Sequence, residues 1–215
     1  MIKIQRVEVM NLHNAIRGAR NPLSSWERMD SGYDDEGRFV LGPTDLSLAD
    51  RLCAAGSDHR KFIRQIFVSA DITAPIYWWK EFDTYKVGTV ANSCSTMHKL
   101  KDTPITVDCF DMGDFADSNE ENNNYNLYTK NMWSKLIDHL EALRKEFNET
   151  KDKRYWKELI RLLPESWLQK RTVTMSYENI ANIYSQRMNH KLTEWSKDFI
   201  QWAENLPYFK ELFYK

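Results

Sequence analysis

Residues 86–96, KVGTVANSCST, combine one cation, one glycine and a run of hydroxyl and amide side chains. Backbone N–H groups and hydroxyls in such a run can surround an anion. The stretch has neither the GxxxxGK[ST] spacing of a Walker loop nor a GxGxxG turn, so an ordinary turn of small residues explains it as well. Both interpretations, an anion-binding loop and a turn without a ligand, stay open at this point.

Arg187 is the second candidate for anion chemistry. It lies three residues after Tyr184 and four after Ile183, so it continues the apolar stripe of a helix that the sequence predicts over 177–188. A guanidinium on such a face needs a partner. That partner is either a carboxylate in a buried ion pair or the phosphate of a ligand, which arginine binds through two parallel hydrogen bonds.

The histidines and cysteines indicate no metal site. None of the five histidines forms an HExxH pair, and none of the three cysteines forms a CxxC pair. Cys94 has His98 four residues later but no third group to orient it, so we assign no nucleophile. An odd number of widely spaced cysteines fits a reducing, cytoplasmic setting.

The elements that position these residues follow from periodicity. Residues 64–73, RQIFVSADIT, alternate as a strand with one apolar face. Thr73 and Pro75 then favour a helix that starts near Ala74 and ends before Gly88. Its Trp78 and Trp79 would be packing residues, and the helix a rigid support for the stretch 86–96.

The rest of the chain predicts strands followed by a helical half. Residues 103–110 are a candidate short strand, a long helix runs from about Lys130, and a shorter one ends before Pro164. A strand at 170–175 leads to Ser176, which can cap the helix that carries Arg187, and a last helical pair follows. Residues 11–45 read as an irregular excursion and 113–126 as an acidic, asparagine-rich loop. We expect one α+β domain over 1–215, with strands packed with long helices and a helical C-terminal half.

Composition excludes some partners. Thirty basic residues oppose thirty-one acidic ones, for a formal charge of -1, so no overall field attracts nucleic acid or an anionic membrane. No apolar run approaches the roughly 20 residues that span a bilayer. We expect a soluble, cytoplasmic protein that binds neither nucleic acid nor membranes.

One segment of the chain contains Ala74-Pro75-Ile76, and another runs from Leu163-Pro164 to Arg187. These segments, about 60–100 and 155–195, together resemble the flavin-dependent thymidylate synthases. In that family a strand leads through an Ala-Pro-Ile helix start into an RQWxRHRxxSxNExSxRY signature, and a later Leu-Pro precedes a strand and a helix that ends in arginine. This chain has Ala74-Pro75-Ile76 at the first place, Leu163-Pro164 at the second and Arg187 at the end.

Carried over from Pro75, the signature falls on changed residues. Its Arg-Gln falls on Lys80-Glu81, its Arg-His-Arg on Thr84-Tyr85-Lys86 and its first serine on Thr89. The Asn-x-x-Ser portion recurs as Asn92-Ser93-Cys94-Ser95 if one residue is inserted, and the arginine that follows becomes Met97. Two flavin-side positions on the late helix, usually Asn-x-Arg, are Ser176 and Glu178.

The resemblance implies a homotetramer that uses reduced FAD, with NADPH and methylenetetrahydrofolate as co-substrates, to transfer a methylene group to dUMP. It places the substrate at Arg187, Ser95, Glu81, Arg161 and Asn92, and the flavin at Lys86, Tyr85, Thr84, Thr89, Ser176 and Glu178. Two alternatives remain. One is a non-catalytic nucleotide-binding or structural relative that has lost FAD, because the changed residues lie mostly on the flavin side. The other is an enzyme that acts on another pyrimidine nucleotide.

Overall fold

A computed structural model describes residues 2–112 and 124–213 of the chain. The chain divides into two compact units, each of which is described by itself. Unit 1 comprises Thr73–Asp83 and Ser93–Arg171, and unit 2 comprises Ile2–Ile72, Thr84–Asn92 and Thr172–Lys215. The expectation of a single domain stays a prediction.

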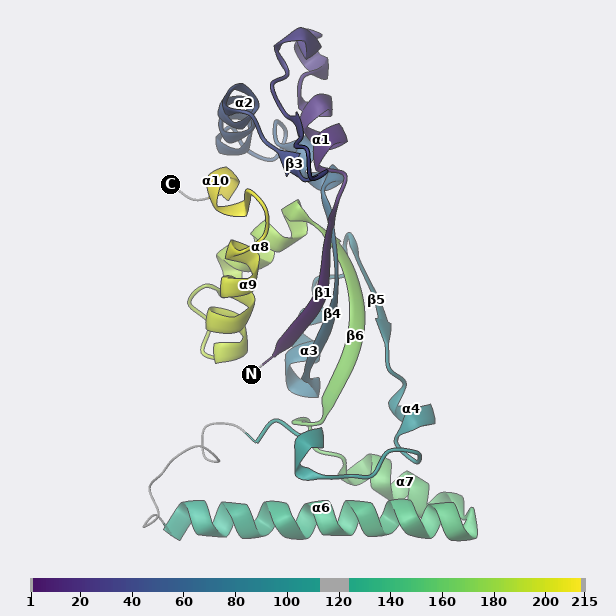
Figure 1. Ribbon diagram of the computed structural model, residues 1–215. Helices are drawn as coiled ribbons and strands as arrows, with labels where there is room; N and C mark the ends of the chain where they lie inside the picture. Colours follow the sequence, from purple (N-terminus) through teal and green to yellow (C-terminus); the bar gives the residue numbers. More distant parts are fainter. Residues whose placement is uncertain (1, 113–123, 214–215) are drawn as a thin grey trace. The chain divides into compact units, whose positions relative to one another are not determined.

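One four-stranded sheet, most of which belongs to unit 2, has the order β1 (Lys3–Met10), β4 (Phe67–Pro75), β6 (Leu168–Ser176) and β5 (Thr89–Ser93) (Figure 1). Two side-chain contacts give the direction of the central pair: Thr172 Oγ1 donates to Asp71 Oδ1 at 2.6 Å, and Thr174 Oγ1 donates to Ser69 Oγ at 3.2 Å. Moving two residues forward on β6 moves the partner two residues back on β4, so these strands are antiparallel.

The predicted alternation in β4 is confirmed. Val68, Ala70 and Ile72 are buried, whereas Phe67 on the other face is 41% exposed. Period-2 side chains with one apolar face are what a strand packed on one side requires.

The helices of unit 2 are α1 (Leu12–Ala19), α2 (Pro43–Ala54), α8 (Tyr177–Arg187), α9 (Ile200–Glu204) and α10 (Phe209–Phe213), with the π-helical turn η5 (Glu194–Phe199). The helix α8 packs against α9, and α10 packs against α2 and α9 (Figure 1). Aromatic residues fill the space between them: Tyr177, Trp195, Phe199 and Phe209 are all fully buried. This core fixes the helix that ends at Arg187.

The stretch 11–45 differs from the irregular excursion that we expected. It contains α1, the 3-10 turns η1 (Asn21–Leu23) and η2 (Trp26–Arg28), and the hairpin of β2 (Gly32–Tyr33) and β3 (Phe39–Val40). The buried Asp45 carboxylate organises it, because it accepts hydrogen bonds from Arg20 Nε at 2.5 Å and Ser31 N at 2.9 Å. The polar residues that suggested a loop therefore make specific bonds instead.

Asp30 completes this arrangement at the start of α2. Its carboxylate accepts hydrogen bonds from the N–H groups of Thr44 at 2.8 Å and Asp45 at 3.0 Å, as a capping group does. Burial raises the pKa of the Asp30 carboxyl group, but the hydrogen bonds from Thr44 and Asp45 together outweigh this effect and lower the pKa to about 2. Gly42 is required beside it, since a Cβ there would lie 2.3 Å from Asp30 Cγ.

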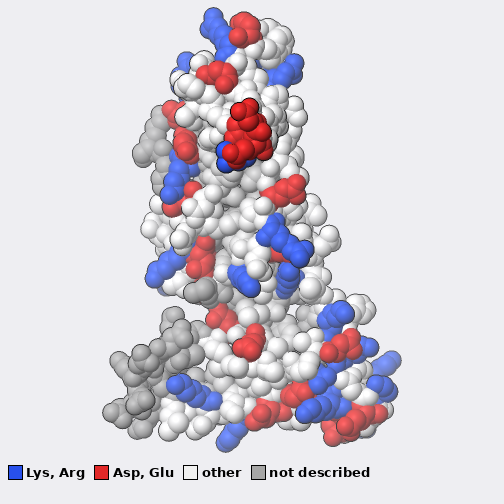
Figure 2. Space-filling view, in the orientation of Figure 1, with Lys and Arg blue, Asp and Glu red and all other residues white. Residues whose placement is uncertain are grey.

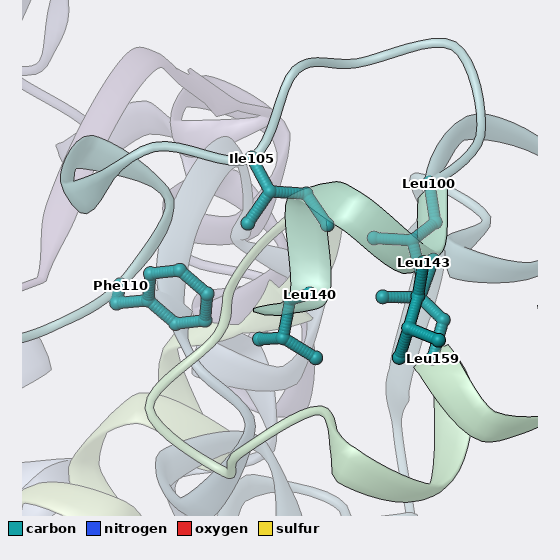
Figure 3. Packing of buried hydrophobic residues seen from close by; sticks show 6 residues of the cluster. All are labelled: Leu100, Ile105, Phe110, Leu140, Leu143 and Leu159. Carbon is teal, nitrogen blue, oxygen red and sulfur yellow. The ribbon is translucent and has the colours of Figure 1, made fainter. Parts of the chain in front are cut away.

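Unit 1 contains the long helix α6 (Asn124–Thr150), which confirms the predicted helix, and α7 (Lys153–Leu162) packed against it. A buried apolar cluster joins these two helices to the segment that precedes them (Figure 3). Its members are Leu100, Ile105, Phe110, Leu140, Leu143 and Leu159. The predicted loop 113–126 lies outside the described residues as far as 123, and 124–126 begin α6.

The predicted strand at 103–110 is wrong. The segment contains only the 3-10 turn η4 (Val107–Cys109) and one isolated bridge from Phe110 to Trp167. Its apolar residues pack into the helical cluster instead of forming a ladder, and Ile105 N donates to Glu141 Oε2 at 2.9 Å. A short apolar run is compatible with either arrangement, so tertiary packing decided the outcome.

The helix predicted from Ala74 begins later. Strand β4 continues through Pro75, which has an extended backbone, and α3 covers Ile76–Phe82. Pairing with the chain before β6 extends the strand, since Ile76 N donates to Trp167 O at 3.1 Å. Trp78 and Trp79 are fully buried, as predicted.

Candidate functional site

Arg187, at the end of α8, is held by two aromatic residues of unit 2. Its Nε donates to Tyr85 Oη at 2.8 Å, and its guanidinium carbon lies 4.9 Å from the Trp195 ring centre and 5.5 Å from that of Tyr85. Tyr85 Oη in turn donates to Gln186 Oε1 at 3.1 Å. Arg187 and Tyr85 are half-buried and Trp195 is fully buried. These contacts fix the plane of the guanidinium before any ligand binds.

The segment that carries Tyr85 is fastened to the start of α8 by Asn179. Ser176 and Asn179 form a capping box in which Asn179 N donates to Ser176 Oγ, and Asn179 Nδ2 reaches across to Val87 O at 2.7 Å. Gly88, with φ +77°, follows at a place where a Cβ would lie 2.8 Å from Asn179 Oδ1. Ser176 is confirmed as the cap of α8, but its hydroxyl also donates to Asn179 Oδ1 at 2.6 Å and is thereby occupied.

Glu178 lies in the first turn of α8 between two arginines of unit 2. Its carboxylate accepts from Arg60 Nε at 3.4 Å, from Arg64 Nη2 at 3.3 Å and from Arg64 Nε. The negative charge is favoured at a helix N-terminus as well. The cluster is an ion-pair network in which the two guanidinium groups compensate the single negative charge of Glu178.

The other flavin-side residues of unit 2 lie along 84–92. Thr84 and Lys86 are exposed, and Lys86 makes no side-chain hydrogen bond or ion pair with the described residues. Thr89 Oγ1 donates to Tyr85 O. Asn92, which the resemblance assigned to the substrate, is exposed on β5, so the stretch expected to be a loop is partly a strand at the sheet edge.

Three predicted substrate residues lie in unit 1. Ser95 caps the short helix α4 (Thr96–Lys99) by accepting from His98 N at 3.3 Å. Glu81 lies half-buried on α3, and Arg161, exposed on α7, donates to Glu158 Oε2 at 3.1 Å. The structure thus brings together Tyr85, Arg187 and, through Asn179, the region of Ser176.

Sequence reasoning did not select Trp195 or Asn179. Both lie near the start of a helix. Trp195 belongs to an apolar stripe, and Asn179 is the third residue after the serine cap. The Ser-x-x-Asn spacing is a recognisable signal for a reciprocal cap. The contact of Trp195 with Arg187 depends on the π-helical turn and has no local signal.

Solved structures of known proteins share the fold of this chain. No protein-family model matches the sequence, and no curated protein matches it. A solved structure of thymidylate synthase X (ThyX) from Helicobacter pylori, with FAD and dUMP, is similar with a TM-score of 0.67 at 17% identity, covering 100% of this chain and 98% of that one. A second structure of the flavin-dependent ThyX from Helicobacter pylori, complexed with FAD and dUMP, gives a TM-score of 0.64 at 18% identity, covering 98% of each chain. The chain therefore has the α+β fold of ThyX.

The residues assigned to FAD by resemblance do not fit that cofactor well. The hydroxyls of Ser176 and Thr89 and the carboxylate of Glu178 make the internal bonds described above, and Glu178 adds a negative charge where a cofactor with phosphates needs cations. Lys86 alone among the six is an exposed cation without an ion pair to the described residues.

Proposed function

We propose that this protein is a diverged relative of the flavin-dependent thymidylate synthases whose site binds a pyrimidine nucleotide, with dUMP as the first candidate. The observation that carries the proposal is that Tyr85 and Trp195 hold the Arg187 guanidinium, by a hydrogen bond from Arg187 to Tyr85 and by contacts with both rings. Its support from outside the site is the fold, shared with proteins solved in complex with dUMP.

Arg187 is assigned to the nucleotide phosphate. A guanidinium matches phosphate oxygens through parallel N–H groups, and one whose plane is already fixed has less side-chain freedom to lose on binding. Lys86 on the neighbouring segment supplies a second, exposed charge of the same sign. Both cations belong to unit 2, as do Tyr85 and Thr89.

Titration calorimetry with dUMP tests the assignment. Arg187→Ala should weaken binding by about 1.5–3 kcal/mol, roughly 10- to 150-fold, because a charge-assisted hydrogen bond is lost. Arg51→Ala is the matched control: Arg51 is exposed in the same unit, and its Nε donates to the carbonyl of Ser47 in its own helix. Equal dUMP affinity in the folded Arg187→Ala variant and the parent would contradict the assignment. Parallel titrations with dCMP and dTMP identify the preferred base.

A second candidate function is the full synthase reaction, in which a methylene group passes from methylenetetrahydrofolate to dUMP with FAD and NADPH. The full-length fold similarity to FAD-bound enzymes favours it, whereas Glu178 between Arg60 and Arg64 favours the non-catalytic relative. Titration with FAD, with and without dUMP, separates the two. We expect no saturation below several hundred micromolar FAD. Tight FAD binding together with tritium release from labelled dUMP would instead establish the synthase.

We also propose that the protein is a cytoplasmic homo-oligomer, with a tetramer as the expected form. Leu127, Tyr128 and Met132 lie within two turns of α6 and are 62%, 66% and 49% exposed, so they offer apolar surface that a second copy of the chain can cover. No helix in the described ranges is long and apolar enough to cross a bilayer, and the visible face mixes both signs of charge (Figure 2). A stable monomer in light scattering at micromolar concentration would contradict the tetramer.

A further inference from the structure

Glu178, in the first turn of α8, binds two arginines from a distant part of the chain. Arg64 lies on the 3-10 turn η3 (Lys61–Gln65), which packs against α8, and Arg60 directly precedes this turn. Arg60 and Arg64 lie 118 and 114 residues before Glu178 in the sequence. The fold of unit 2 therefore brings two cations to one carboxylate.

Three N–H groups converge on the two oxygens of this carboxylate. Arg60 Nε and Arg64 Nη2 donate to Glu178 Oε1 at 3.4 and 3.3 Å, and Arg64 Nε donates to Glu178 Oε2. Guanidinium N–H groups bind carboxylate and phosphate oxygens in the same way. The donors that hold Glu178 are thus the donors that a phosphate group requires.

The backbone that carries Arg64 is fixed independently of the Glu178 side chain. Ile63 and Ile66, which flank Arg64 in the chain, are both fully buried. Tyr177 N, at the start of α8, donates to Ile66 O at 2.9 Å and fastens the helix to this segment. We therefore expect the arginines to keep their places when the carboxylate is removed.

The cluster contains more positive than negative charge. The side chains of Arg60 and Arg64 are 24% and 47% exposed, and that of Glu178 is 15% exposed. The exposed Asp58 also attracts Arg64 through space, but it forms no ion pair with the described residues. A phosphate group carries a charge of about −1.5 to −2 near pH 7, so it would balance two guanidinium groups more fully than one carboxylate does.

We infer that Arg60 and Arg64 form an anion site that the protein's own Glu178 occupies, so that a ligand phosphate binds there only when this carboxylate is displaced. Glu178 thereby excludes phosphate-bearing ligands from this part of unit 2, which gives a physical cause for the poor fit of FAD. The inference does not rest on the proposed nucleotide site. Arg187 lies nine residues further along α8, or about 14 Å along the helix axis.

The test is titration calorimetry of the full chain with inorganic pyrophosphate at low ionic strength, where screening of exposed charges is weak. Glu178→Gln keeps the size of the side chain and removes its charge. This variant should bind pyrophosphate about 10- to 100-fold more tightly than the parent, because the ligand no longer competes with a charge-assisted hydrogen bond. Glu8→Gln is the matched control, since Glu8 is an exposed carboxylate of the same unit without an ion pair to the described residues. It should bind pyrophosphate like the parent.

Three further variants show whether the charge of Glu178 and the guanidinium of Arg64 are responsible. Glu178→Asp keeps the negative charge and should give no gain in affinity. Adding Arg64→Gln to Glu178→Gln should abolish the gain. Arg64→Gln alone should leave the pyrophosphate affinity of the parent unchanged, because Glu178 already occupies that guanidinium. This last measurement does not depend on the folding of Glu178→Gln.

The inference is overturned if folded Glu178→Gln binds pyrophosphate no more tightly than the parent, or if Glu8→Gln gains as much. It is also overturned if Arg64→Gln alone weakens pyrophosphate binding, since Arg64 would then be open to ligands in the parent. The gain should persist when Glu178→Gln is combined with Arg187→Ala. A failure of the nucleotide assignment would appear separately, as unchanged dUMP affinity in Arg187→Ala.

Discussion

Replacing Tyr85 by phenylalanine isolates the hydroxyl that orients Arg187. The change removes the acceptor of the 2.8 Å bond from Arg187 Nε and the donor of the 3.1 Å bond to Gln186, and it keeps the ring against the guanidinium. We expect the Tyr85→Phe variant to fold and to bind dUMP less tightly than the parent, but more tightly than Arg187→Ala.

The size of the effect follows from burial and from what is retained. A hydrogen bond to a charged group contributes about 1.5–3 kcal/mol, and the low end applies because Arg187 and Tyr85 are half-buried, so water can replace the lost acceptor. The ring contacts to Tyr85 and Trp195, each worth about 0.5–2 kcal/mol, remain. Because these retained contacts still orient the guanidinium, we expect a loss below that low end, about 1 kcal/mol in dUMP binding free energy, or roughly 5-fold in affinity.

Titration calorimetry on Tyr85→Phe, Arg187→Ala and the parent measures this order. Tyr33→Phe serves as the control, because Tyr33 is 64% exposed in the same unit and its ring stacks on His13 at 5.5 Å. If Tyr85→Phe binds dUMP as tightly as the parent while Arg187→Ala does not, the hydroxyl has no orienting role. If neither variant differs from the parent, the nucleotide phosphate lies elsewhere.

Two predictions concern stability. Asp45→Asn should lower the free energy of unfolding in urea by about 3–5 kcal/mol, because it breaks a buried ion pair in which Arg20 is 3% exposed and Asp45 0%; a change below about 1 kcal/mol would refute this. The hydrogen bond from Arg144 lowers the pKa of Glu141 from 4.5 to about 2, although burial opposes it. This stabilisation is present above pH 4.5 and is lost as the pH falls through 2, so Glu141→Gln should flatten the acid limb of the stability curve over that interval.

Elements with a strong internal period were predictable from sequence. The alternation of β4, the apolar stripe of α6 and the serine cap of α8 each depend on neighbours within a few residues, and the structure confirms all three. The strand predicted at 103–110 and the helix predicted from Ala74 depended on which distant segment offers hydrogen bonds. The backbone N–H of Ile105 donates to Glu141, and that of Ile76 donates to Trp167. No local sequence pattern specifies such partners.

The candidate site shows the same division. The sequence predicted that Arg187 lies on the apolar stripe of its helix and that its guanidinium needs a partner. The identity of that partner was not, because Tyr85 lies 102 residues earlier in the chain. Glu178 likewise meets Arg64, 114 residues away, and only the tertiary structure shows that its charge is already balanced.

The buried tryptophans of α3 acquire a role in unit 1 that sequence could only suggest. Trp79 Nε1 donates to Gln169 O at 2.9 Å, and Arg171 lies over the Trp79 ring at 4.3 Å, so the helix braces the start of β6. Gln169 Nε2 then donates to Cys94 O at 3.0 Å, at the end of the small-residue stretch.

The beginning of that stretch is held separately in unit 2, where Asn179 donates to Val87 O. Each end of the segment is thus tied by a carboxamide within its own unit, Gln169 in unit 1 and Asn179 in unit 2. A segment with so many small polar residues would otherwise lose much conformational entropy on binding. If the proposed nucleotide binds to this stretch, ties at its ends lower that cost. Lys86, which carries no ion pair to the described residues, is exposed and follows Tyr85, the hydrogen-bond partner of Arg187.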